Sequence, residues 1–437
     1  KGRELTAHDF VYSLKRHFDK DNRYQGAWLW QGRIVGLEEW KAEGTDYDVE
    51  VDGLRALDRY SVQIKLKKPY HKLTHTLAQG YSAIVPREAV EYYGREFSVR
   101  PVGSGPFRLS LIDSVKAVLL PNPKFRQEPI DLAAEGYDEA IHGKYDIKQI
   151  EGKIPPLLDR LEVHFITESL SRWNSFTKDD EIEFSGIPKE LTDEVLAQKQ
   201  PEILLKPDYA ARYHMANMIE SGFVHSDFNM RDPEIGYNPD PERNQMNKAL
   251  RCAIRFAYNW EERNRTMYTD LGVIFPGIIP PVTPEFDPQG STASLEHNPQ
   301  KGNDLLEQAG WTAEKLPVID YGGVASVTTR QMFEQFRGWM SKIGYPKDKI
   351  TFNSFATFGD FNKAVKQAKI KFVGMGWGLD YPDAENTLQL FYGPNGSPGS
   401  NNANFDNPEY NELYRKTAVM QPSAERTRLY RQMNDIV

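Results

Sequence analysis

The segment 374–386, GMGWGLDYPDAEN, places a tryptophan and three acids among glycines and a proline. Trp377 offers a flat apolar wall, and the Asp380 carboxylate could pair with a cationic group through a charge-assisted hydrogen bond. Asp383 and Glu385 are instead typical of residues that shape and cap a following helix, because carboxylates stabilise a helix N-terminus. The residue types therefore allow either a solvated turn or a ligand site.

The same acids raise the alternative of a glycoside hydrolase, an enzyme that uses two carboxylates about 5–10 Å apart. The 22 Tyr, 22 Phe and 8 Trp residues of the chain would suit stacking against sugar rings. Catalytic carboxylates, however, usually come from different strands, whereas Asp380, Asp383 and Glu385 follow one another within one turn. A hydrolase is therefore kept only as the alternative outside the class of binding proteins.

Other motifs that could support catalysis or metal binding are incomplete. His71 and His75 have the i,i+4 spacing of zinc ligands, but the glutamate expected after the first histidine is missing and Pro69 lies just before the pair. The stretch GMGWGL fails the dinucleotide pattern GxGxxG because its last position is Leu379. The stretch 103–107, GSGPF, lacks the lysine and hydroxyl of a phosphate loop. We therefore predict a protein that is not an enzyme and that needs no cofactor or metal.

The composition describes an ordinary globular chain of two or three domains, with 437 residues of which 39% are hydrophobic and 27% charged. A net charge of −8 lacks the basic surplus that nucleic-acid binding requires. No apolar run approaches the roughly 20 residues of a membrane-spanning helix. The single cysteine, Cys252, excludes an internal disulfide, and the helical apolar spacing around it predicts a buried residue. We expect a monomer with no nucleic-acid partner.

The first half of the chain combines helical and strand patterns. A capping box that begins at Thr6, followed by apolar residues at helical spacing, predicts a helix over 7–18. Val62, Ile64 and Leu66 alternate with polar residues and predict a half-exposed strand. Further strands are expected over 106–112, 115–121 and 161–166, with a polar surface excursion over 126–146.

After about residue 213, helices and strands alternate, which implies right-handed βαβ units and a largely parallel sheet. The expected helices cover 241–259, 260–272, 299–309, 327–342 and 358–368, and the expected strands cover 317–321, 350–354 and 370–376. Gly272 and Gly310 should close the second and third of these helices. Ligands of open α/β sheets bind outside the carboxyl ends of strands. The acidic segment after strand 370–376 therefore lies where a ligand site is expected.

Four stretches, in order, resemble the motifs of the family 5 extracellular solute-binding proteins, which are peptide- and nickel-type receptors of ATP-binding-cassette importers. These stretches are ELTAHDFVYSLKR, PVGSGPFRL with VLLPNPKF, MNKALRCAIRFAYNWEE, and the run from GWGLDYPDAENTLQLFY to NANFDNPEYNELYRKTA. Each motif is loose alone, but four in register across nearly the whole chain make the resemblance specific. The longer stretch 126–158 is similar to the long-looped oligopeptide-type members. The family's first portion and last strands have no counterpart, so we expect a segment truncated at both ends.

Two positions depart from the family's motifs. Leu379 stands where alanine or glycine is common, and Asn259-Trp260 replaces the usual Asp-Arg. The resemblance nevertheless implies an α/β protein with a bilobal, periplasmic-binding-protein-like fold of class II type and an extra small domain. It places 1–102 in the small domain, 103–213 in the first main lobe and 214–437 in the second. A ligand would be enclosed in a cleft between the lobes by hinge closure.

The function implied by the resemblance is to capture peptides and deliver them to a membrane permease, without catalysis. The implied location is the periplasm, or the cell surface through a lipoprotein anchor. A relative of the same family that binds oligosaccharides or another small solute stays open as the alternative.

The resemblance also assigns candidate ligand-binding residues. In peptide-binding members, the aspartate of the W-x-x-D element pairs with the α-ammonium group of the ligand. This role falls to Asp380, with Trp377 beside the ligand backbone and Gly378 and Tyr381 adjoining them. The remaining candidates are Asp227, Phe228 and Asn229 at the crossover from the first to the second lobe, and Tyr24 and Trp28 as a roof from the small domain. No residue is predicted to bind a ligand carboxylate.

Overall fold

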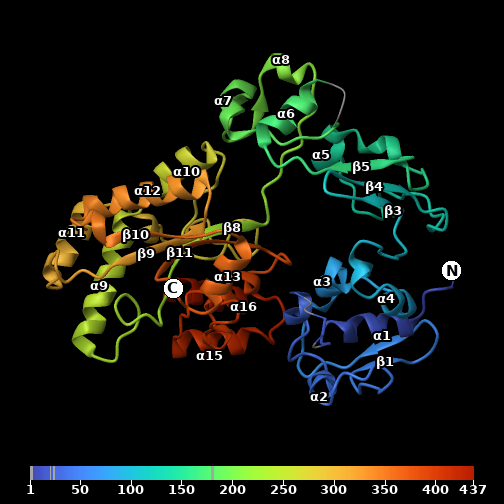
Figure 1. Cartoon of the computed structure of the whole chain (residues 1–437), viewed down its shortest axis with the longest axis horizontal. Coiled ribbons are helices and arrows are strands. Elements are labelled where there is room, and N and C mark those ends of the chain that lie inside the picture. Colours follow the sequence, from blue (N-terminus) through green and yellow to red (C-terminus); the bar gives the residue numbers. More distant parts are fainter. Residues whose placement is uncertain (1–2, 20, 23–24, 179–181) are drawn as a thin grey trace. The chain divides into compact units, whose positions relative to one another are not determined.

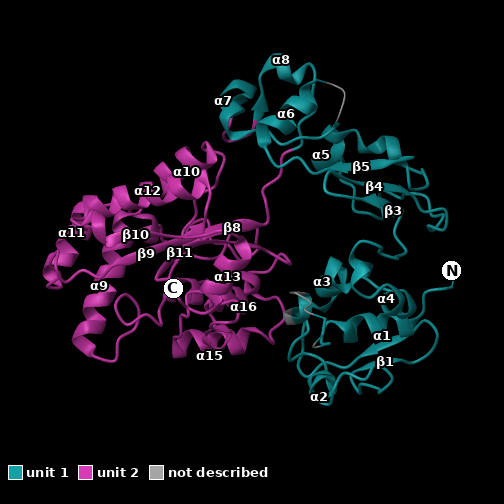
Figure 2. Cartoon of the chain, viewed as in Figure 1, with its two compact units in different colours: residues 1–197, 204–216 teal, residues 198–203, 217–437 magenta. Residues whose placement is uncertain are grey.

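The computed structural model describes residues 3–19, 21–22, 25–178 and 182–437. The chain forms two compact units, one made of residues 1–197 and 204–216 and the other of residues 198–203 and 217–437 (Figure 2). The predicted division into three parts at residues 102 and 213 stays a prediction. No helix among the described residues is long and apolar enough to cross a membrane.

The first unit begins with a small core of helices and a two-stranded sheet. Helix α1 (Ala7–Arg16) begins as predicted, because the Thr6 N–H donates to the Asp9 carboxylate over 2.8 Å, and it ends before the predicted limit at residue 18. Strands β1 (Leu54–Ala56) and β2 (Val62–Ile64) pair antiparallel, which confirms the strand predicted from alternation. The other helices of this part are α2 (Leu37–Ala42), α3 (Leu73–Ala78) and α4 (Arg87–Tyr93).

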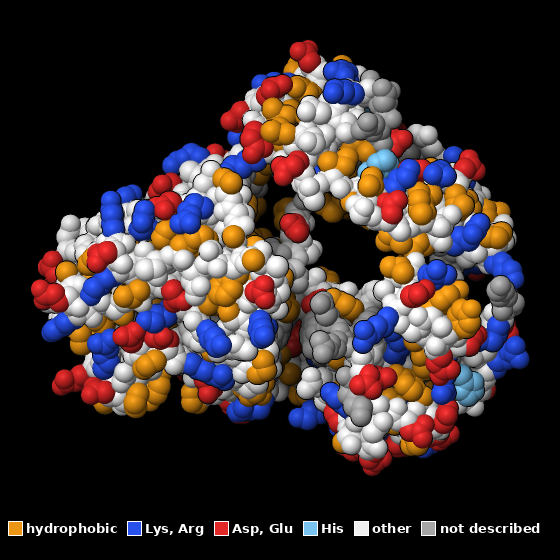
Figure 3. Space-filling view, viewed as in Figure 1, with side chains coloured by type: hydrophobic (Ala, Val, Ile, Leu, Met, Phe, Trp, Pro, Cys, Tyr) orange, Lys and Arg blue, Asp and Glu red, His pale blue; other side chains and the backbone are white. Residues whose placement is uncertain are grey.

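The first unit continues with a three-stranded antiparallel sheet in the order β3-β4-β5. Its strands, β3 (Phe107–Ile112), β4 (Lys116–Pro121) and β5 (Leu161–His164), confirm three predictions. Val115 and Val163 of this region are exposed, and Figure 3 shows hydrophobic side chains on its visible surface. The remaining elements are the short helix α5 (Glu139–His142) within the polar excursion, α6 (Ser169–Thr177), α7 (Thr192–Val195), β6 (Leu196–Gln198), β7 (Leu204–Leu205) and α8 (Pro207–Ala210).

The second unit is built on a four-stranded sheet in the order β10-β9-β11-β8 (Figure 1). Strand β9 (Ile319–Val324) runs parallel to both β10 (Ile350–Phe355) and β11 (Phe372–Gly378). Strand β8 (Gly222–Phe228) pairs antiparallel with β11 along its whole length, from Gly222↔Gly378 to Phe228↔Phe372. The largely parallel sheet is confirmed, with one antiparallel edge strand.

Helices cover both faces of this sheet. Phe372 of β11 belongs to a buried cluster with residues of α9 (Pro241–Ala257), α11 (Pro299–Gln308) and α12 (Val327–Lys342). The next residue, Val373, faces the opposite side, where it joins residues of α13 (Phe358–Lys366). A third cluster forms around the C-terminal helices α14 (Glu385–Leu388), α15 (Pro408–Thr417) and α16 (Ala424–Ile436).

Most helix predictions in this unit are confirmed, and α12 has the predicted limits. Helix α10 (Trp260–Tyr268) ends earlier than predicted, because Thr269 takes a left-handed conformation with φ 53° and ends the helix in place of Gly272. The prediction of a buried Cys252 is also wrong, because the residue is half-buried on α9.

Candidate ligand-binding site

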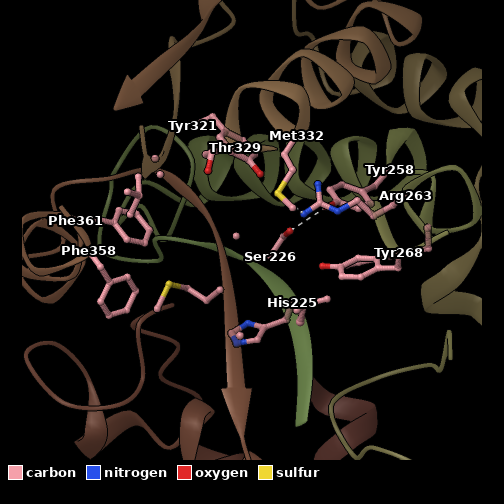
Figure 4. Close-up of a pocket in the computed structure, with 18 residues that line it drawn as sticks. His225, Ser226, Tyr258, Arg263, Tyr268, Tyr321, Thr329, Met332, Phe358 and Phe361 are labelled. Atoms are coloured by element: carbon pink, nitrogen blue, oxygen red, sulfur yellow. Dashed lines mark hydrogen bonds between the residues drawn. The ribbon is translucent and has the colours of Figure 1, made fainter. Parts of the chain in front are cut away.

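A cavity of about 270 Å³ lies within the second unit, at the carboxyl ends of β9 and β11 (Figure 4). Its lining includes backbone from two glycine-rich stretches, Gly322-Gly323 of β9 and Gly374-Met375-Gly376 of β11. A Cβ atom on Gly323 would lie 2.5 Å from the Thr329 side chain, so a larger residue there would displace Thr329. Glycine inside a strand often marks a place where another group approaches the backbone closely.

One end of the cavity is polar. Arg263 of α10 and Ser226 of β8 both line it, and Figure 4 shows the Arg263 guanidinium group, the Met332 sulfur and the Ser226 hydroxyl turned toward one another. The Arg263 Nη2 donates to the Met332 sulfur over 3.1 Å, and Ser226 donates to the Tyr258 hydroxyl over 3.3 Å. Arg263 is buried, with 6% of its surface exposed.

The tyrosines beside this end are uncharged at neutral pH. Burial raises the pKa of the Tyr258 hydroxyl, and burial raises the pKa of Tyr321 to about 12. Both phenols therefore keep their protons well above pH 7, so neither supplies a negative charge next to Arg263.

The other end of the cavity is aromatic and opens toward α13. Phe358 is 63% exposed at the first position of α13, whereas Phe361 is buried in the cluster beneath it. Exposed aromatic rings at the mouth of a cavity offer apolar surface to a ligand. The cavity thus has a cationic, hydroxyl-rich end and an apolar end.

Asp380 lies just beyond the carboxyl end of β11, where Asn386 contacts both its main chain and its side chain. Asn386 is fully buried, its Nδ2 donates to Asp380 Oδ2 over 3.3 Å, and its Oδ1 accepts from the Asp380 N–H and, over 2.7 Å, from the Trp377 indole. Burial raises the pKa of the Asp380 carboxyl, while the hydrogen bond from Asn386 opposes that shift. Trp377 is the penultimate residue of β11 and not a loop residue, because the antiparallel pairing with β8 extends the strand to Gly378.

The other two acids of this segment are buried in an internal network. Asp383 Oδ2 lies 2.9 Å from Arg426, and Asp383 Oδ1 accepts from the Glu385 N–H, so it shapes the start of α14 as predicted. Glu385 accepts hydrogen bonds from the hydroxyls of Tyr381 and Tyr414. Neither carboxylate is placed for a sugar substrate, which argues against the hydrolase alternative.

The remaining predicted residues have internal partners as well. Asp227 lies 2.8 Å from His225 Nδ1, the Phe228 ring packs 5.3 Å from that of Phe372, and Asn229 donates to the Ala368 carbonyl over 2.8 Å. Tyr381 is 3% exposed and Gly378 is exposed. Tyr24 and the side chain of Trp28 lie outside the described residues. The ligand contacts predicted for all of these residues stay predictions.

None of the predicted residues that the structure describes lines the cavity, and the residues that do were not singled out from the sequence. The glycine pair inside the strand DYGGV was one available signal, because such glycines weaken a strand unless close approach requires them. The burial of Arg263 could not be predicted from the sequence. An arginine within the polar stretch WEERNRTMY is expected on the solvent-facing surface of a helix.

Comparisons with known proteins agree on one family. The family model "Bacterial extracellular solute-binding proteins, family 5 Middle" matches residues 1–399. The glutathione-binding protein GsiB of Salmonella typhimurium is 21% identical over 385 residues, which cover 87% of this chain and 65% of that protein. The GsiB protein of Escherichia coli K12 is 20% identical over 389 residues, with the same coverage of 87% and 65%. The chain thus spans less than two thirds of these curated relatives.

Solved structures share the fold over the full length of this chain. A periplasmic oligopeptide-binding protein of Borrelia burgdorferi superposes with a TM-score of 0.71 at 20% identity, covering 100% of this chain and 76% of that one. The murein tripeptide-binding protein MppA of Escherichia coli gives a TM-score of 0.71 at 17% identity, with coverage of 100% and 76%. At these identities the likeness shows the fold, which is the bilobal fold of periplasmic peptide-binding proteins.

Proposed function

Because this chain belongs to the family 5 bacterial extracellular solute-binding proteins, we propose that it is the substrate-binding receptor of an ATP-binding-cassette importer and that its ligands are peptides. Relatives named for binding glutathione, oligopeptides and murein tripeptide support this ligand class. The partner would be the membrane permease of the importer, and the working location would be the periplasm. Enclosure of the ligand by hinge closure is implied by the family and stays a prediction.

The observation that carries the proposal is the placement of Asp380 immediately after β11. Ligands of open α/β sheets bind at the carboxyl ends of strands, and Asp380 and the cavity both occupy that edge. Asn386 fixes the Asp380 carboxylate before any ligand arrives, which lowers the entropy lost on binding. A half-buried carboxylate gains about 1.5–3 kcal/mol from a charge-assisted hydrogen bond to an ammonium group.

We also propose that the protein binds its ligand without chemical turnover. A receptor requires differential affinity between conformations and no nucleophile. Asp383 and Glu385 are the acids that suggested a pair of catalytic carboxylates. Asp383 pairs with Arg426, and Glu385 accepts a hydrogen bond from Tyr381. The alternative within the family is a receptor for oligosaccharides or another small solute. No feature of the cavity specifically favours it, because the buried cation Arg263 suits a negatively charged group better than a neutral sugar.

Native mass spectrometry of the purified full-length protein tests the ligand class directly. We expect adducts whose masses correspond to short peptides and which disappear after denaturation and refolding. Incubation of the stripped protein with a mixed tripeptide library should restore them, and the peptides should be recovered intact. Adducts spaced by hexose masses would favour the oligosaccharide alternative, and shortened or cleaved ligands would favour a hydrolase.

A further inference from the structure

The cavity contains a buried cation without a negative partner. No carboxylate oxygen among the described residues lies within 4.0 Å of Arg263, and its Nε has no hydrogen-bond partner. Its Nη2 donates to the Met332 sulfur, which is a weak acceptor, and the neutral Tyr321 hydroxyl is a further hydrogen-bond partner of the side chain. An unpaired buried charge is costly, and native proteins normally pair it or use it to hold a ligand.

The surroundings of Arg263 do not supply an internal counter-charge. Tyr258 and Tyr321 are neutral phenols at physiological pH for the reason given above. The Asp227 carboxylate, on the neighbouring strand β8, is directed to His225 at 2.8 Å. The positive charge at this end of the cavity is therefore uncompensated by the described part of the chain.

The first turn of α12 lies beside the same cavity. Helix α12 contains 16 residues, and Thr329 in its first turn lines the cavity. The aligned peptide dipoles of a helix place a partial positive charge at the N-terminus, which attracts anions. Arg263 and the start of α12 thus both contribute positive potential near the cavity.

The size of the cavity suits one end of a ligand. Its volume of about 270 Å³ falls below the roughly 300–1,000 Å³ of pockets that enclose a whole drug-sized ligand. Gly376 at the cavity and Asp380 are four residues apart, so their Cα atoms are at most about 14 Å from one another. This separation is within the length of a short extended peptide.

We propose that Arg263 binds a carboxylate group of the ligand inside this cavity and so makes the protein selective for ligands with a negative charge at the end opposite their ammonium group. This inference rests on the proposed peptide-binding function and supplies its missing partner for a carboxylate. The carboxylate would belong either to the C-terminus of a peptide or to an acidic side chain. The aromatic rim at Phe358 would then receive the apolar part next to that group.

Three tripeptide libraries distinguish these sources when they are offered to the full-length protein and binding is measured by native mass spectrometry. The first has free C-termini, the second is C-terminally amidated, and the third is amidated but ends in glutamate. We expect the amidated library to bind about 10- to 100-fold more weakly than the free one, as the loss of a charged hydrogen bond implies. Preferential binding of the glutamate library over the other amides would identify a side-chain carboxylate instead.

Arg263→Met is the variant that tests the residue, and Arg265→Met, which removes an exposed charge from the same helix, is its control. We expect Arg263→Met to bind all three libraries equally, whereas Arg265→Met should keep the wild-type preference. The melting temperature of Arg263→Met should not fall below that of the wild type, because this substitution removes a buried charge that has no negative partner.

The outcomes separate the two proposals. Equal binding of all three libraries by the wild type would overturn the role of Arg263 while leaving a peptide receptor in place, and this comparison does not require the variant to fold. Binding of no library by the wild type would overturn the peptide receptor and this inference with it.

Discussion

The guanidinium group of Arg426 lies 2.9 Å from the Asp383 carboxylate, and both side chains are almost removed from solvent, with 3% and 10% of their surface exposed. The same guanidinium group lies 3.0 Å from Glu285, which is also buried. Burial and the charge of Asp383 raise the pKa of the Glu285 carboxyl. One cation therefore holds two buried acids together and joins α16 to the segment that carries Asp380.

Arg426→Met should destabilise the protein by about 3–5 kcal/mol, because it leaves two buried acids facing each other without a cation. Urea unfolding followed by circular dichroism gives the free energy of unfolding. Arg428→Met on the same helix is the control, since Arg428 pairs with Glu425 at the surface and its loss should cost less than about 0.5 kcal/mol. A similar loss in both variants would contradict a structural role for the buried network.

Asp380→Asn should weaken peptide binding by about 10- to 100-fold without destabilising the free protein. The amide has the shape of the carboxylate and can still accept from Asn386, but it cannot pair with an ammonium group. Calorimetric titration with a bound tripeptide measures the affinity, and Glu242→Gln, at an exposed site on α9, controls for the lost charge. N-acetylated peptides should bind the wild type as weakly as free peptides bind the variant.

The affinity for peptides should also depend on pH through Asp380. Burial raises the pKa of this carboxyl above its ordinary value of 3.8, so the charged form is lost at a higher pH than for an exposed aspartate. Because only the charged form pairs with an ammonium group, affinity should be constant near neutrality and should fall as the pH is lowered toward that raised pKa. Titrations between pH 4 and 7 measure the decline, which should be absent in Asp380→Asn.

Asn386→Ala should both destabilise the second unit and weaken ligand binding. It removes the acceptor of the Trp377 indole N–H and the donor to Asp380, and an unsatisfied buried group costs about 1–3 kcal/mol. Denaturation monitored by tryptophan fluorescence gives the stability, and the same tripeptide titration gives the affinity. A variant with reduced stability but unchanged affinity would show that Asn386 does not position Asp380.

The first unit should lose stability as the pH falls, because of His17. This histidine is 6% exposed, and burial together with the nearby Arg16 lowers its pKa from 6.5 to about 4. A lowered pKa means that the folded state disfavours the charged ring, so the stabilisation is complete above pH 6.5 and decreases as the pH falls through about 4. The full effect is roughly 3 kcal/mol.

Replacing His17 with Phe should remove this part of the pH dependence, as measured by urea unfolding at several values between pH 4.5 and 7. His8→Gln is the matched control, since His8 lies on α1, which ends just before His17, and is exposed. An identical pH dependence in wild type and His17→Phe would show that other groups account for it.

The periodicity of the sequence predicted the elements of the second unit well, because helices such as α12 present one continuous apolar face to a core. The pairing of β8 with β11 was not predictable in this way, since it joins segments about 150 residues apart and depends on tertiary contacts. That pairing is also why Trp377 lies in a strand, although its glycine neighbours resemble a loop.

The candidate site was predictable only where the family resemblance supplied it. Asp380 was predicted from a family motif, and the structure adds its two hydrogen bonds with Asn386. Arg263 could not be found, because burial of one charged residue on an otherwise polar helix depends on which face meets the sheet. Asp227 is a predicted ligand contact that makes an internal hydrogen bond with His225, so its residue type alone does not separate the two roles.

The glycines beneath the cavity have a consequence for how this scaffold can change. Gly322, Gly323 and Gly374 contribute only main chain to the lining of the cavity, so its side-chain chemistry comes from other elements, among them α10 and α12. Those helices can exchange a residue such as Arg263 or Thr329 without disturbing the hydrogen bonds between strands. On the proposed function, substitutions on these two helices should change the ligand preference while the sheet keeps its structure.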